Sequence, residues 1–387
     1  MKFFHLSDLH IGKQLHRYSL AEDQRHILSQ IVELARSEQP DAILIAGDIY
    51  DVSVPSAEAV SLFDYFLSAL CTITPQIPIL LIAGNHDSAR RIDFASSILE
   101  KHQVYIAGLP PMHQEEKIHR VTLQDEYGEV DFYLLPFVKP SYVKGIMEEE
   151  IKGYDMAVKK LIEREEIDPT RRNVILTHQF YTVSGVEPQT CDSEIAVVGG
   201  IENVDIAALE PFDYAALGHI HRAQKMGNAK NRYCGTPLAY SVSEAGEEKS
   251  VTVVTLKEKG SEPEIMTLPL MPLRKVRKLT GNLETILDQA TEEMREDYVS
   301  ITLTDEVEAY QPKEQLEEKY DHILEIRIDN ARTRKLMELT EQKVEDLNPY
   351  EAFCAFFLEM NQREMTEEED KILRSVLLEQ NGGKVEE

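Results

Sequence analysis

The first part of the chain alternates between short apolar runs and longer segments whose apolar residues follow a helical spacing. Ala42–Ala46 and Pro78–Ala83 are continuous apolar runs that are too short for helices, so each predicts a buried strand. Phe3–Leu6 predicts another strand. Over Leu20–Ser37 the apolar residues recur at helical spacing, and Pro55 opens a second helical pattern. This alternation predicts an α/β fold.

The same pattern continues through the middle of the chain. Asn173–Leu176 and Tyr214–Leu217 are two more short apolar runs, and the charged segment Val143–Glu166 predicts a helix. Further along, Ser250–Leu256 is the clearest strand of a strand-rich stretch. These elements predict one large α/β domain over residues 1–270.

A second unit is expected after the proline-flanked segment Pro269–Pro272. Beyond it, one helix and two strands predict a small α/β domain, over Leu283–Glu296, Tyr298–Leu303 and Ile323–Ile328. Pro349 starts a further helix, and Met365–Glu368 has the sequence of an N-terminal cap for another. We therefore predict three parts, 1–270, 271–340 and 341–387.

Polar motifs follow five of the apolar runs in a fixed order. They are Asp8-Leu9-His10, Gly47-Asp48-Ile49-Tyr50-Asp51, Gly84-Asn85-His86-Asp87, Thr177-His178 and Gly218-His219-Ile220-His221. Each motif lies at the C-terminal end of a predicted strand, the edge where the loops of an α/β sheet converge on one crevice. A single Gly-Asp pair is usually an ordinary turn. Five such motifs at five strand ends indicate one shared site.

The residue types in the first two motifs favour a site for two divalent metal ions. A two-metal hydrolase holds its ions about 3.5–4 Å apart and clamps an in-line displacement at phosphorus between them. Asp8 and His10 are two residues apart in what we expect to be extended backbone, so both can reach one ion from the same face. Asp48, at the end of the next strand, is the natural bridge between the ions.

The later motifs complete the predicted metal site. Asn85 offers a neutral oxygen to the second ion and His178 adds an imidazole to it. His219 and His221 are again two residues apart and can divide between the two ions. Such a mixed nitrogen and oxygen set suits manganese, iron or zinc better than calcium.

His86 is predicted to serve as an acid and not as a ligand. It follows Asn85 directly, but it points elsewhere if the backbone there is extended. It is then the candidate acid beside the leaving oxygen, and the carboxylate of Asp51 or of Asp87 is expected to orient it.

The net charge of the chain has to be reconciled with binding of a phosphate-containing substrate. The formal net charge of the 387 residues is -28, whereas proteins that bind phosphate backbones are usually basic. We interpret the acidic C-terminal part either as a solvated helical surface or as a docking surface for a basic partner.

The four cysteines show no C-x-x-C spacing, and we find neither a secretory signal nor an apolar run of membrane length. We expect a cytoplasmic protein with reduced thiols and no membrane contact.

Phosphate steering would have to come from local basic residues. The candidates are Arg90, Arg91, Arg222, Lys225 and the run Arg274–Lys278. The alternative interpretation of each is an ordinary solvated surface.

With these motifs assembled, the chain resembles the calcineurin-like metallophosphoesterases. Within that superfamily it is similar to the SbcD family, the nuclease subunits of bacterial SbcCD complexes. The closer likeness spans roughly 1–270 and rests on His5–Gly12, Ala46–Asp51, Phe212–His221 and Tyr233–Pro237. It continues more weakly through Pro272–Val276. The chain has Asp51 where archaeal counterparts carry a histidine.

This resemblance implies a two-sheet sandwich flanked by helices, a small α/β capping domain and a C-terminal helical segment that docks on an SbcC-type coiled-coil ATPase. It implies a two-metal, manganese-dependent DNA hydrolase in repair, recombination and replication. The expected activities are exonuclease action on double-stranded ends and endonuclease action on hairpin or single-stranded DNA, by a homodimer within a heterotetramer.

The resemblance also assigns the site residues by motif. One metal takes Asp8, His10, Asp48 and His221, and the other takes Asp48, Asn85, His178 and His219. His86 is the catalytic histidine.

Three alternatives remain open at this point. One is a small-substrate member of the superfamily, such as a nucleotide phosphodiesterase or a protein phosphatase. The second is a scaffold that keeps the fold without metal, and the third is a subunit with little activity apart from its partner.

Overall fold

The structure is a computed structural model that describes residues 1–146, 151–194, 202–306, 311–331, 333–334, 349–361 and 363–380. These residues form two compact units. The first, which we call the body, comprises Met1–Lys278, Glu292–Ser300 and Tyr320–Leu324. The second, which we call the C-terminal unit, comprises Leu279–Thr291, Ile301–Lys319 and Glu325–Glu387.

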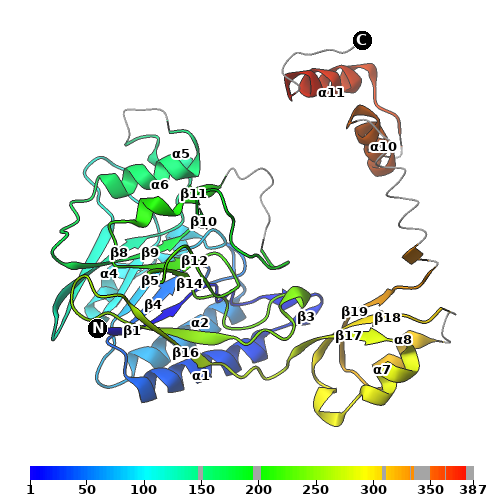
Figure 1. The fold of residues 1–387 in the computed structure, drawn as a ribbon, viewed down its shortest axis with the longest axis horizontal. Helices are drawn as coiled ribbons and strands as arrows, with labels where there is room; N and C mark the ends of the chain where they lie inside the picture. Colours follow the sequence, from blue (N-terminus) through cyan, green and yellow to red (C-terminus); the bar gives the residue numbers. More distant parts are fainter. Residues whose placement is uncertain are drawn as a thin grey trace. The chain divides into compact units, whose positions relative to one another are not determined.

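Two six-stranded sheets form the centre of the body (Figure 1). The first has the order β16-β15-β1-β4-β5-β6, with bounds Glu264–Pro269, Ser250–Thr255, Lys2–Leu6, Ala42–Ala46, Ile79–Ile82 and Val104–Ala107. The second has the order β13-β14-β12-β9-β8-β7, with bounds Gln224–Lys225, Asn231–Tyr233, Tyr214–Gly218, Arg172–His178, Gly128–Leu135 and His119–Asp125. The predicted α/β class with two large sheets is confirmed.

Parallel pairing brings the important strand ends to one edge of each sheet. In the first sheet β1, β4, β5 and β6 run parallel to one another, and in the second β8, β9, β12 and β14 do so. All residues of β4, β5, β9 and β12 are buried, as expected for strands covered on both faces. The loops that follow β1, β4, β5, β9 and β12 therefore leave the sheets from their carboxyl edges.

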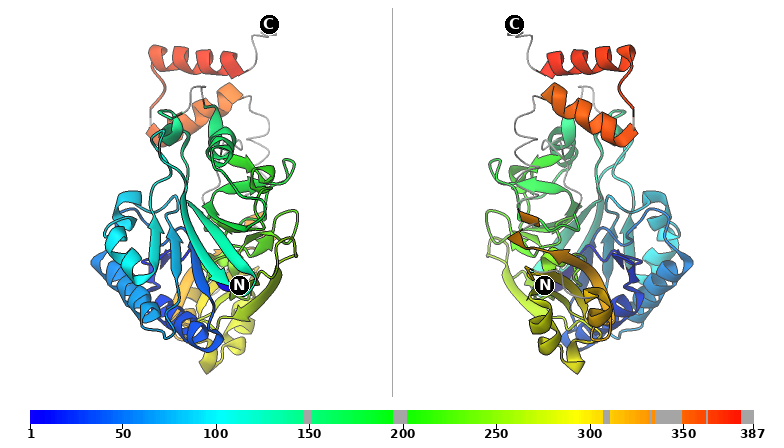
Figure 2. Two further views of the ribbon diagram at one scale, coloured as in Figure 1. Left: turned by 90° about the vertical axis from the view of Figure 1, so that its left-hand side faces the viewer. Right: turned by 90° about the vertical axis from the view of Figure 1, so that its right-hand side faces the viewer.

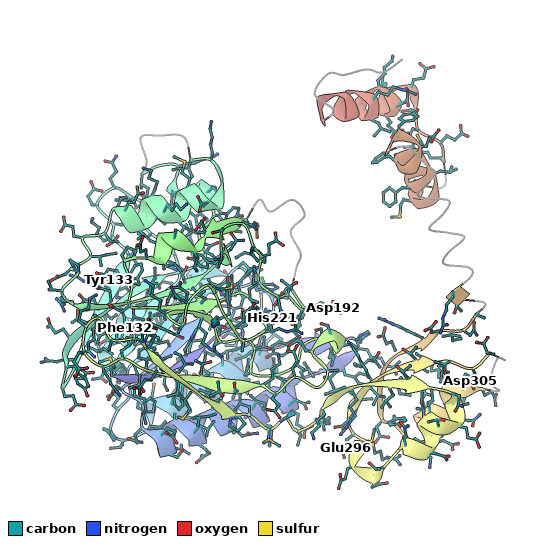
Figure 3. The ribbon with its side chains drawn as sticks, in the orientation of Figure 1. Phe132, Tyr133, Asp192, His221, Glu296 and Asp305 are labelled. Atoms are coloured by element: carbon teal, nitrogen blue, oxygen red, sulfur yellow. The ribbon has the colours of Figure 1, made fainter. Side chains whose placement is uncertain are left out.

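Three apolar clusters divide the body into layers. One joins Phe3, Leu44, Phe132 and their neighbours between the two sheets, where the rings of Phe3 and Phe132 meet edge to face at 5.8 Å. Another packs helices onto the outer face of the first sheet, and the third does so for the second sheet. Phe132 and Tyr133, labelled in Figure 3, are neighbours on β8 and belong to the inner and an outer cluster respectively.

Helices cover the outer faces of both sheets, and in Figure 2 the blue helices lie on one side of the body and the green ones on the other. On the first sheet these are α1, α2, α3, α4 and the 3-10 turn η1, at Ala21–Glu38, Ala57–Cys71, Ala89–Ile92, Ser96–Leu99 and Glu100–His102. On the second they include α5, α6 and η2, at Pro140–Val143, Gly153–Glu163 and Ile206–Leu209. Ser56 caps α2 by accepting the N–H of Ala59 at 3.2 Å, so the helix predicted after Pro55 is confirmed.

Several short elements complete the body. They are β2 and β3 at Gln14–Leu15 and Tyr18–Ser19, β10 and β11 at Phe180–Thr182 and Asn203–Asp205, and the 3-10 turns η3 and η4 at Val242–Glu244 and Glu292–Met294.

Two helix predictions were wrong in their extent. Of the helix expected over 143–166, only Gly153–Glu163 is helical, as α6, because α5 already ends at Val143, Ile151 and Lys152 are not helical, and Gly153 has a left-handed backbone with φ of 83°. Residues 147–150 of that prediction lie outside the described part. The helix expected over 283–296 is α7, which ends at Gln289.

A three-stranded sheet of order β17-β18-β19 has the bounds Val276–Gly281, Tyr298–Leu303 and His322–Ile328. Within the C-terminal unit α7 and α8 span Leu283–Gln289 and Pro312–Glu317, and α10 and α11 span Pro349–Asn361 and Glu367–Gln380. Thr366 caps α11 through reciprocal bonds with Glu369, so the predicted cap is confirmed. Among the described residues, no helix is long and apolar enough to cross a bilayer.

Candidate metal centre

The five polar motifs meet at the carboxyl edges of the two sheets. The loops that carry the first two motifs are joined by backbone hydrogen bonds from Asp8 to Gly47 and from His10 to Asp48, both at 3.0 Å. The carboxylate of Asp8 accepts the N–H of His219 at 3.0 Å, which ties the first sheet to the second. The motifs that are far apart in the sequence therefore form one site inside the body.

The first group of donor atoms surrounds His10. Its Nε2 lies 3.1 Å from Nε2 of His221 and 3.6 Å from Oδ2 of Asp48. Ligand atoms of Asp8, His10 and His221 all lie within 4.8 Å of one another. Two donors that bind one ion at about 2.1 Å are separated by about 3.0–3.4 Å, so this spacing fits a shared ion.

The second group surrounds His178. Its Nε2 lies 3.0 Å from Oδ1 of Asn85 and 3.3 Å from Oδ2 of Asp48. Nδ1 of His219 also lies 3.0 Å from the Asn85 oxygen. Asp48 is thus the carboxylate that both groups share. The other oxygen of Asp48 accepts the N–H of His86 at 2.9 Å, which leaves Oδ2 directed at the two imidazoles.

The hydrogen-bond partners of His178 indicate that these donors are suited to a cation. Nδ1 of His178 lies 2.7 Å from the carbonyl oxygen of Ala46, which can only accept, so Nδ1 carries the hydrogen. The Nε2 lone pair of His178 then faces the Asn85 oxygen, another acceptor, at 3.0 Å. Two acceptors facing each other at this distance repel unless a proton on Nε2 or a bound cation lies between them. The residues present therefore fit a divalent metal.

The ionisation of the carboxylates indicates a surplus of buried negative charge. Burial raises the pKa of Asp8 to about 8, although His178 opposes the rise. Burial also acts to raise the pKa of Asp48, but the facing charge of His178 outweighs it and holds that pKa well below its usual range. Burial acts to lower the pKa of His178, but Asp48 raises it to about 9. The proton on His178 balances a charge that a cation could balance instead.

The other three imidazoles are held in the form that binds metal. Burial lowers the pKa of His10, of His219 to about 3, and of His221 well below its ordinary value. A neutral imidazole offers a lone pair, whereas an imidazolium does not.

The backbone of the site is strained where the ligands stand. The φ angle is 53° at Asp8, 42° at His10, 50° at Asp48 and 98° at His219, in the left-handed region that non-glycine residues rarely adopt. The expectation of extended backbone at Asp8 and His10 was therefore wrong, since β1 ends at Leu6. Their side chains converge because of left-handed turns.

Glycine is required where backbone approaches these donors. A Cβ on Gly84 would lie 2.1 Å from Oδ1 of Asp48, and one on Gly218 would lie 1.9 Å from the Ala46 oxygen. The glycines of the motifs therefore make room for the donor atoms.

His86 lies beside the first group, with its ring 4.9 Å from that of His10. Its Nδ1 lies 2.8 Å from the carbonyl oxygen of Asp51, so the backbone orients it and not a carboxylate. The Asp87 carboxylate instead accepts the N–H groups of Ile49, Tyr50 and Gly84 at 2.9–3.0 Å. The prediction of a carboxylate partner for His86 was wrong, and so was that of extended backbone, because the loop bends there.

The Asp51 carboxylate has a different neighbour. Its Oδ1 lies 2.7 Å from Nζ of Lys13 and 3.4 Å from Nδ1 of His10. Burial acts to raise the pKa of Asp51, but His10 and Lys13 outweigh it and lower that pKa to about 2.

Several basic candidates are occupied by acidic partners. Arg222 pairs with Glu247, Arg274 pairs with Glu22 and Asp23 at 2.7 and 3.0 Å, and Arg277 pairs with Asp297 at 2.5 Å. Arg90 and Arg91 are exposed after the Asn85 loop, and neither has an ion pair among the described residues.

Sequence reasoning missed the residues behind His221. Ser193 Oγ lies 2.7 Å from His221 Nδ1, Glu194 accepts the His221 N–H at 2.5 Å, and Glu244 accepts from Ser193 at 2.8 Å. None of these residues lies in a motif or at a predicted strand end, so only the folded chain places them.

Comparisons with known proteins identify the family of the chain. Residues 1–223 match the family model described as calcineurin-like phosphoesterase, and residues 272–361 match SbcD_C, described as type 5 capsule protein repressor C-terminal domain. The chain therefore belongs to the calcineurin-like phosphoesterases, which are hydrolases of phosphate esters that use divalent metals.

A curated relative narrows the class further. Over 390 residues the chain is 30% identical to the SbcD subunit of nuclease SbcCD from Staphylococcus epidermidis, covering 99% of this chain and 100% of that protein. Within its class the chain belongs to the SbcD family, and the resemblance noted from the motifs is confirmed.

Solved structures with remote similarity include two that this chain covers almost completely. TT1561 of Thermus thermophilus has a TM-score of 0.40 at 14% identity, with 69% of this chain and 98% of that chain covered. A dimetal phosphatase from Danio rerio has a TM-score of 0.37 at 15% identity, with the same coverage of 69% and 98%.

Proposed function

We propose that this chain is the two-metal DNA nuclease subunit of an SbcCD-type complex. In this proposal it acts as an exonuclease on double-stranded ends and as an endonuclease on hairpin or single-stranded DNA, in repair and recombination in the cytoplasm. The name of the Staphylococcus epidermidis relative supports the nuclease class. The observation that carries the two-metal proposal is Oδ2 of Asp48, which lies 3.6 Å from His10 Nε2 and 3.3 Å from His178 Nε2.

The donor groups support a division of ligands between two ions. One ion would be held by Asp8, His10, Asp48 and His221, and the other by Asp48, Asn85, His178 and His219. Two carboxylates with one amide oxygen and four imidazoles form a mixed set that suits manganese. When bound, such ions act as Lewis acids on a phosphodiester and lower the pKa of water.

The chain's own residues would do the rest of the work. His86 stands beside the ligands with Nδ1 committed to the Asp51 carbonyl, so its Nε2 is the atom that can hand a proton to the leaving oxygen. Arg90 and Arg91 would hold the phosphate backbone, because they are exposed and carry no acidic partner among the described residues. Asn85, His86 and His219 are only half-buried, so substrate would approach from their side.

We propose that the three parts predicted from the sequence have separate functions. Residues 1–270 would cut DNA, 271–340 would act as a cap that selects the substrate, and 341–387 would dock on an SbcC-type coiled-coil ATPase. Exposed apolar side chains on α10 support the docking role, among them Phe356 and Met360 at 58% and 67% exposure. Two copies of the chain would form the homodimer of a heterotetramer.

Metal analysis and two substrates test this proposal. Wild type should take up two divalent ions, cut hairpin DNA with manganese, and lose activity in chelator until manganese is restored. Asp48→Asn should lose most metal and nearly all hydrolysis, whereas Asp64→Asn on the exposed face of α2 should lose neither. Full activity in chelator would overturn the two-metal proposal. Rapid hydrolysis of a small phosphodiester without cutting of DNA would instead identify a small-substrate enzyme.

A further inference from the structure

His221 is held from behind by the segment Cys191–Glu194. Ser193 Oγ lies 2.7 Å from Nδ1 of the His221 ring, and the Glu194 carboxylate accepts the backbone N–H of His221 at 2.5 Å. Figure 3 shows Asp192, of this segment, close to His221. Two consecutive side chains therefore hold both the ring and the backbone of one proposed metal ligand.

The directions of these hydrogen bonds determine the tautomer of His221. Ser193 has a single hydroxyl hydrogen and donates it to Oε1 of Glu244 at 2.8 Å. The Ser193 oxygen can then only accept from His221, so Nδ1 of His221 must carry the hydrogen. The Nε2 lone pair of His221 is left free on the side that faces His10 at 3.1 Å.

The carboxylate of Glu244 is held in place at the end of the hydrogen-bonded chain that runs from His221 through Ser193 to Glu244, which we call the relay. The carboxylate is fully buried, which is costly unless its oxygens are paired. Lys249 Nζ lies 2.6 Å from Oε2, and Ser241 Oγ donates to Oε1 at 2.8 Å. The backbone N–H of Tyr240 also donates to Oε1, at 3.2 Å. The carboxylate is therefore set in place before any metal arrives.

The neighbouring basic residues argue against a separate metal site at Cys191, Glu244 and Glu247. Ligand atoms of Cys191, Glu244 and Glu247 lie close enough together to suggest a separate metal. However, the Lys249 ammonium donates to the Glu244 carboxylate, and Arg222 Nε donates to Glu247 at 2.8 Å. The carboxylates are already neutralised by these cations, so the cluster supports His221 instead of binding another ion.

We propose that Ser193 and Glu244 are positioning residues for the metal that His221 binds. The hydroxyl and the carboxylate together hold the His221 ring in one tautomer and one orientation, with Nε2 presented to the ion. This inference rests on the proposed function, because it takes His221 as a ligand. Loss of such an outer partner typically lowers metal affinity by about 10–100-fold.

The test compares variants of the full chain after removal of metal by a chelator. Manganese is titrated into each protein and followed by calorimetry and by the electron paramagnetic resonance of the bound ion. In Ser193→Ala and Glu244→Gln we expect one of the two ions to bind about 10–100-fold more weakly while the other keeps its affinity. Ser193→Thr, which retains the hydroxyl, should restore the affinity.

Two neighbouring substitutions serve as matched controls. Ser243 accepts the N–H of Asp192 at 2.8 Å, so Ser243→Ala loosens the same segment without touching His221. Glu247→Gln alters a carboxylate of the same cluster that has no contact with Ser193 or His221 among the described residues. Both controls should bind two ions as wild type does, and thermal unfolding without metal should show whether each variant is folded.

The outcomes separate this inference from the proposed function. If wild type and Ser193→Ala both bind two ions with equal affinity, the relay is overturned and the metal site stands. Equal losses in Ser243→Ala and Ser193→Ala would also overturn it, because packing of the segment would then explain the effect. If wild type itself binds no manganese, the proposed function fails first. Should Glu244→Gln not fold, the comparison of Ser193→Ala with Ser193→Thr decides.

Discussion

The imidazole of His178 donates its Nδ1 hydrogen to the carbonyl oxygen of Ala46 at 2.7 Å. Ala46 ends β4 in the first sheet and His178 ends β9 in the second, so this bond joins the two sheets at the candidate metal centre. It fixes the tautomer of His178 and directs Nε2 toward Asp48 and Asn85. Substitutions that push these two strand ends apart should therefore disturb metal binding.

Gly218→Ala tests this close approach. A Cβ at Gly218 would lie 1.9 Å from the Ala46 oxygen and 2.7 Å from Nδ1 of His178, so the strands must shift. We expect reduced manganese content and a loss of about 1–3 kcal/mol in the free energy of unfolding, the usual cost of overpacking. Gly145→Ala is the control, because its Cβ would meet nothing nearer than 3.9 Å. Wild-type metal affinity in Gly218→Ala would contradict the argument.

His86→Gln separates the proposed acid from the ligands. His86 is bound to the Asp51 carbonyl and lies beside the two donor groups, so the variant should retain two ions and DNA binding. Its cutting rate should fall by about 10²–10⁴, the scale of a positioned proton donor. Metal content and single-turnover cleavage of hairpin DNA measure the two effects, with His102→Gln, at an exposed histidine, as the control. If His86→Gln purifies without metal, His86 is a ligand.

Arg90 and Arg91 should contribute to DNA affinity but not to the chemistry. We expect the double variant Arg90→Glu/Arg91→Glu to bind hairpin DNA more weakly and to reduce the salt dependence of binding by about one ion per arginine. Hydrolysis of a small phosphodiester should be unchanged. Fluorescence anisotropy at several salt concentrations measures the slope. Arg36→Glu, exposed on α1 and paired with Glu33, is the control that should leave DNA binding intact.

The ends of the buried strands, and the polar residues that follow them, could be predicted from the sequence. Apolar runs such as Ala42–Ala46 are buried on both faces, and parallel pairing brings their carboxyl ends together. A short, continuous apolar run of this kind by itself predicts a strand that is buried on both faces. The gathering of Asp8, Asp48 and His178 at one place follows from that topology, so it was predictable without coordinates.

Local backbone and outer partners were not predictable in the same way. The left-handed φ at Asp8 and at His219 depends on hydrogen bonds to distant loops, so no neighbouring residue indicates it. Ser193 and Glu244 lie 28 and 23 residues from His221 on opposite sides of it in the chain, and neither belongs to a periodic pattern. The pairing of Arg274 with Asp23, 251 residues earlier, likewise could not be inferred from a basic run.

Asp125 and Arg172 should make the stability of the body depend on pH. Arg172 Nη1 donates to the Asp125 carboxylate at 2.9 Å, at the end of β9 opposite the metal centre. Burial acts to raise the pKa of Asp125, but Arg172 and the N-terminal ammonium of Met1 together outweigh it and hold that pKa well below its usual range. Because the folded pKa is lower than the unfolded one, this stabilisation is present above pH ~4 and is lost as pH falls toward the folded pKa.

Asp125→Asn should therefore unfold more easily at neutral pH, by about 1–3 kcal/mol, and the difference from wild type should shrink on acidification. Urea unfolding at several pH values between neutral and acid measures this. Activity per folded molecule should be unchanged, since the pair is remote from the donors. Asp64→Asn should show no such pH-dependent difference, and a constant gap between Asp125→Asn and wild type would contradict the assignment.

The C-terminal helices provide the test of the partner. Phe356 and Met360 on α10 expose 58% and 67% of their surface, whereas Arg374 of α11 donates to Tyr350 at 2.7 Å and links the two helices. A helix pair with its apolar side chains outward is suited to contact with a groove on another protein. We expect Phe356→Glu/Met360→Glu, and removal of residues 348–387, to abolish co-purification with an SbcC-type ATPase and ATP-stimulated cutting.

The same changes should leave manganese content and basal nuclease activity intact, because all the proposed ligands lie in the body. Lys371→Glu adds a negative charge at an exposed position of α11 without removing an apolar contact, so it should still bind the ATPase. Affinity is measured by pull-down and calorimetry with the purified ATPase. If the shortened chain binds it as tightly as the full chain, the docking surface lies elsewhere and the two helices have a structural role.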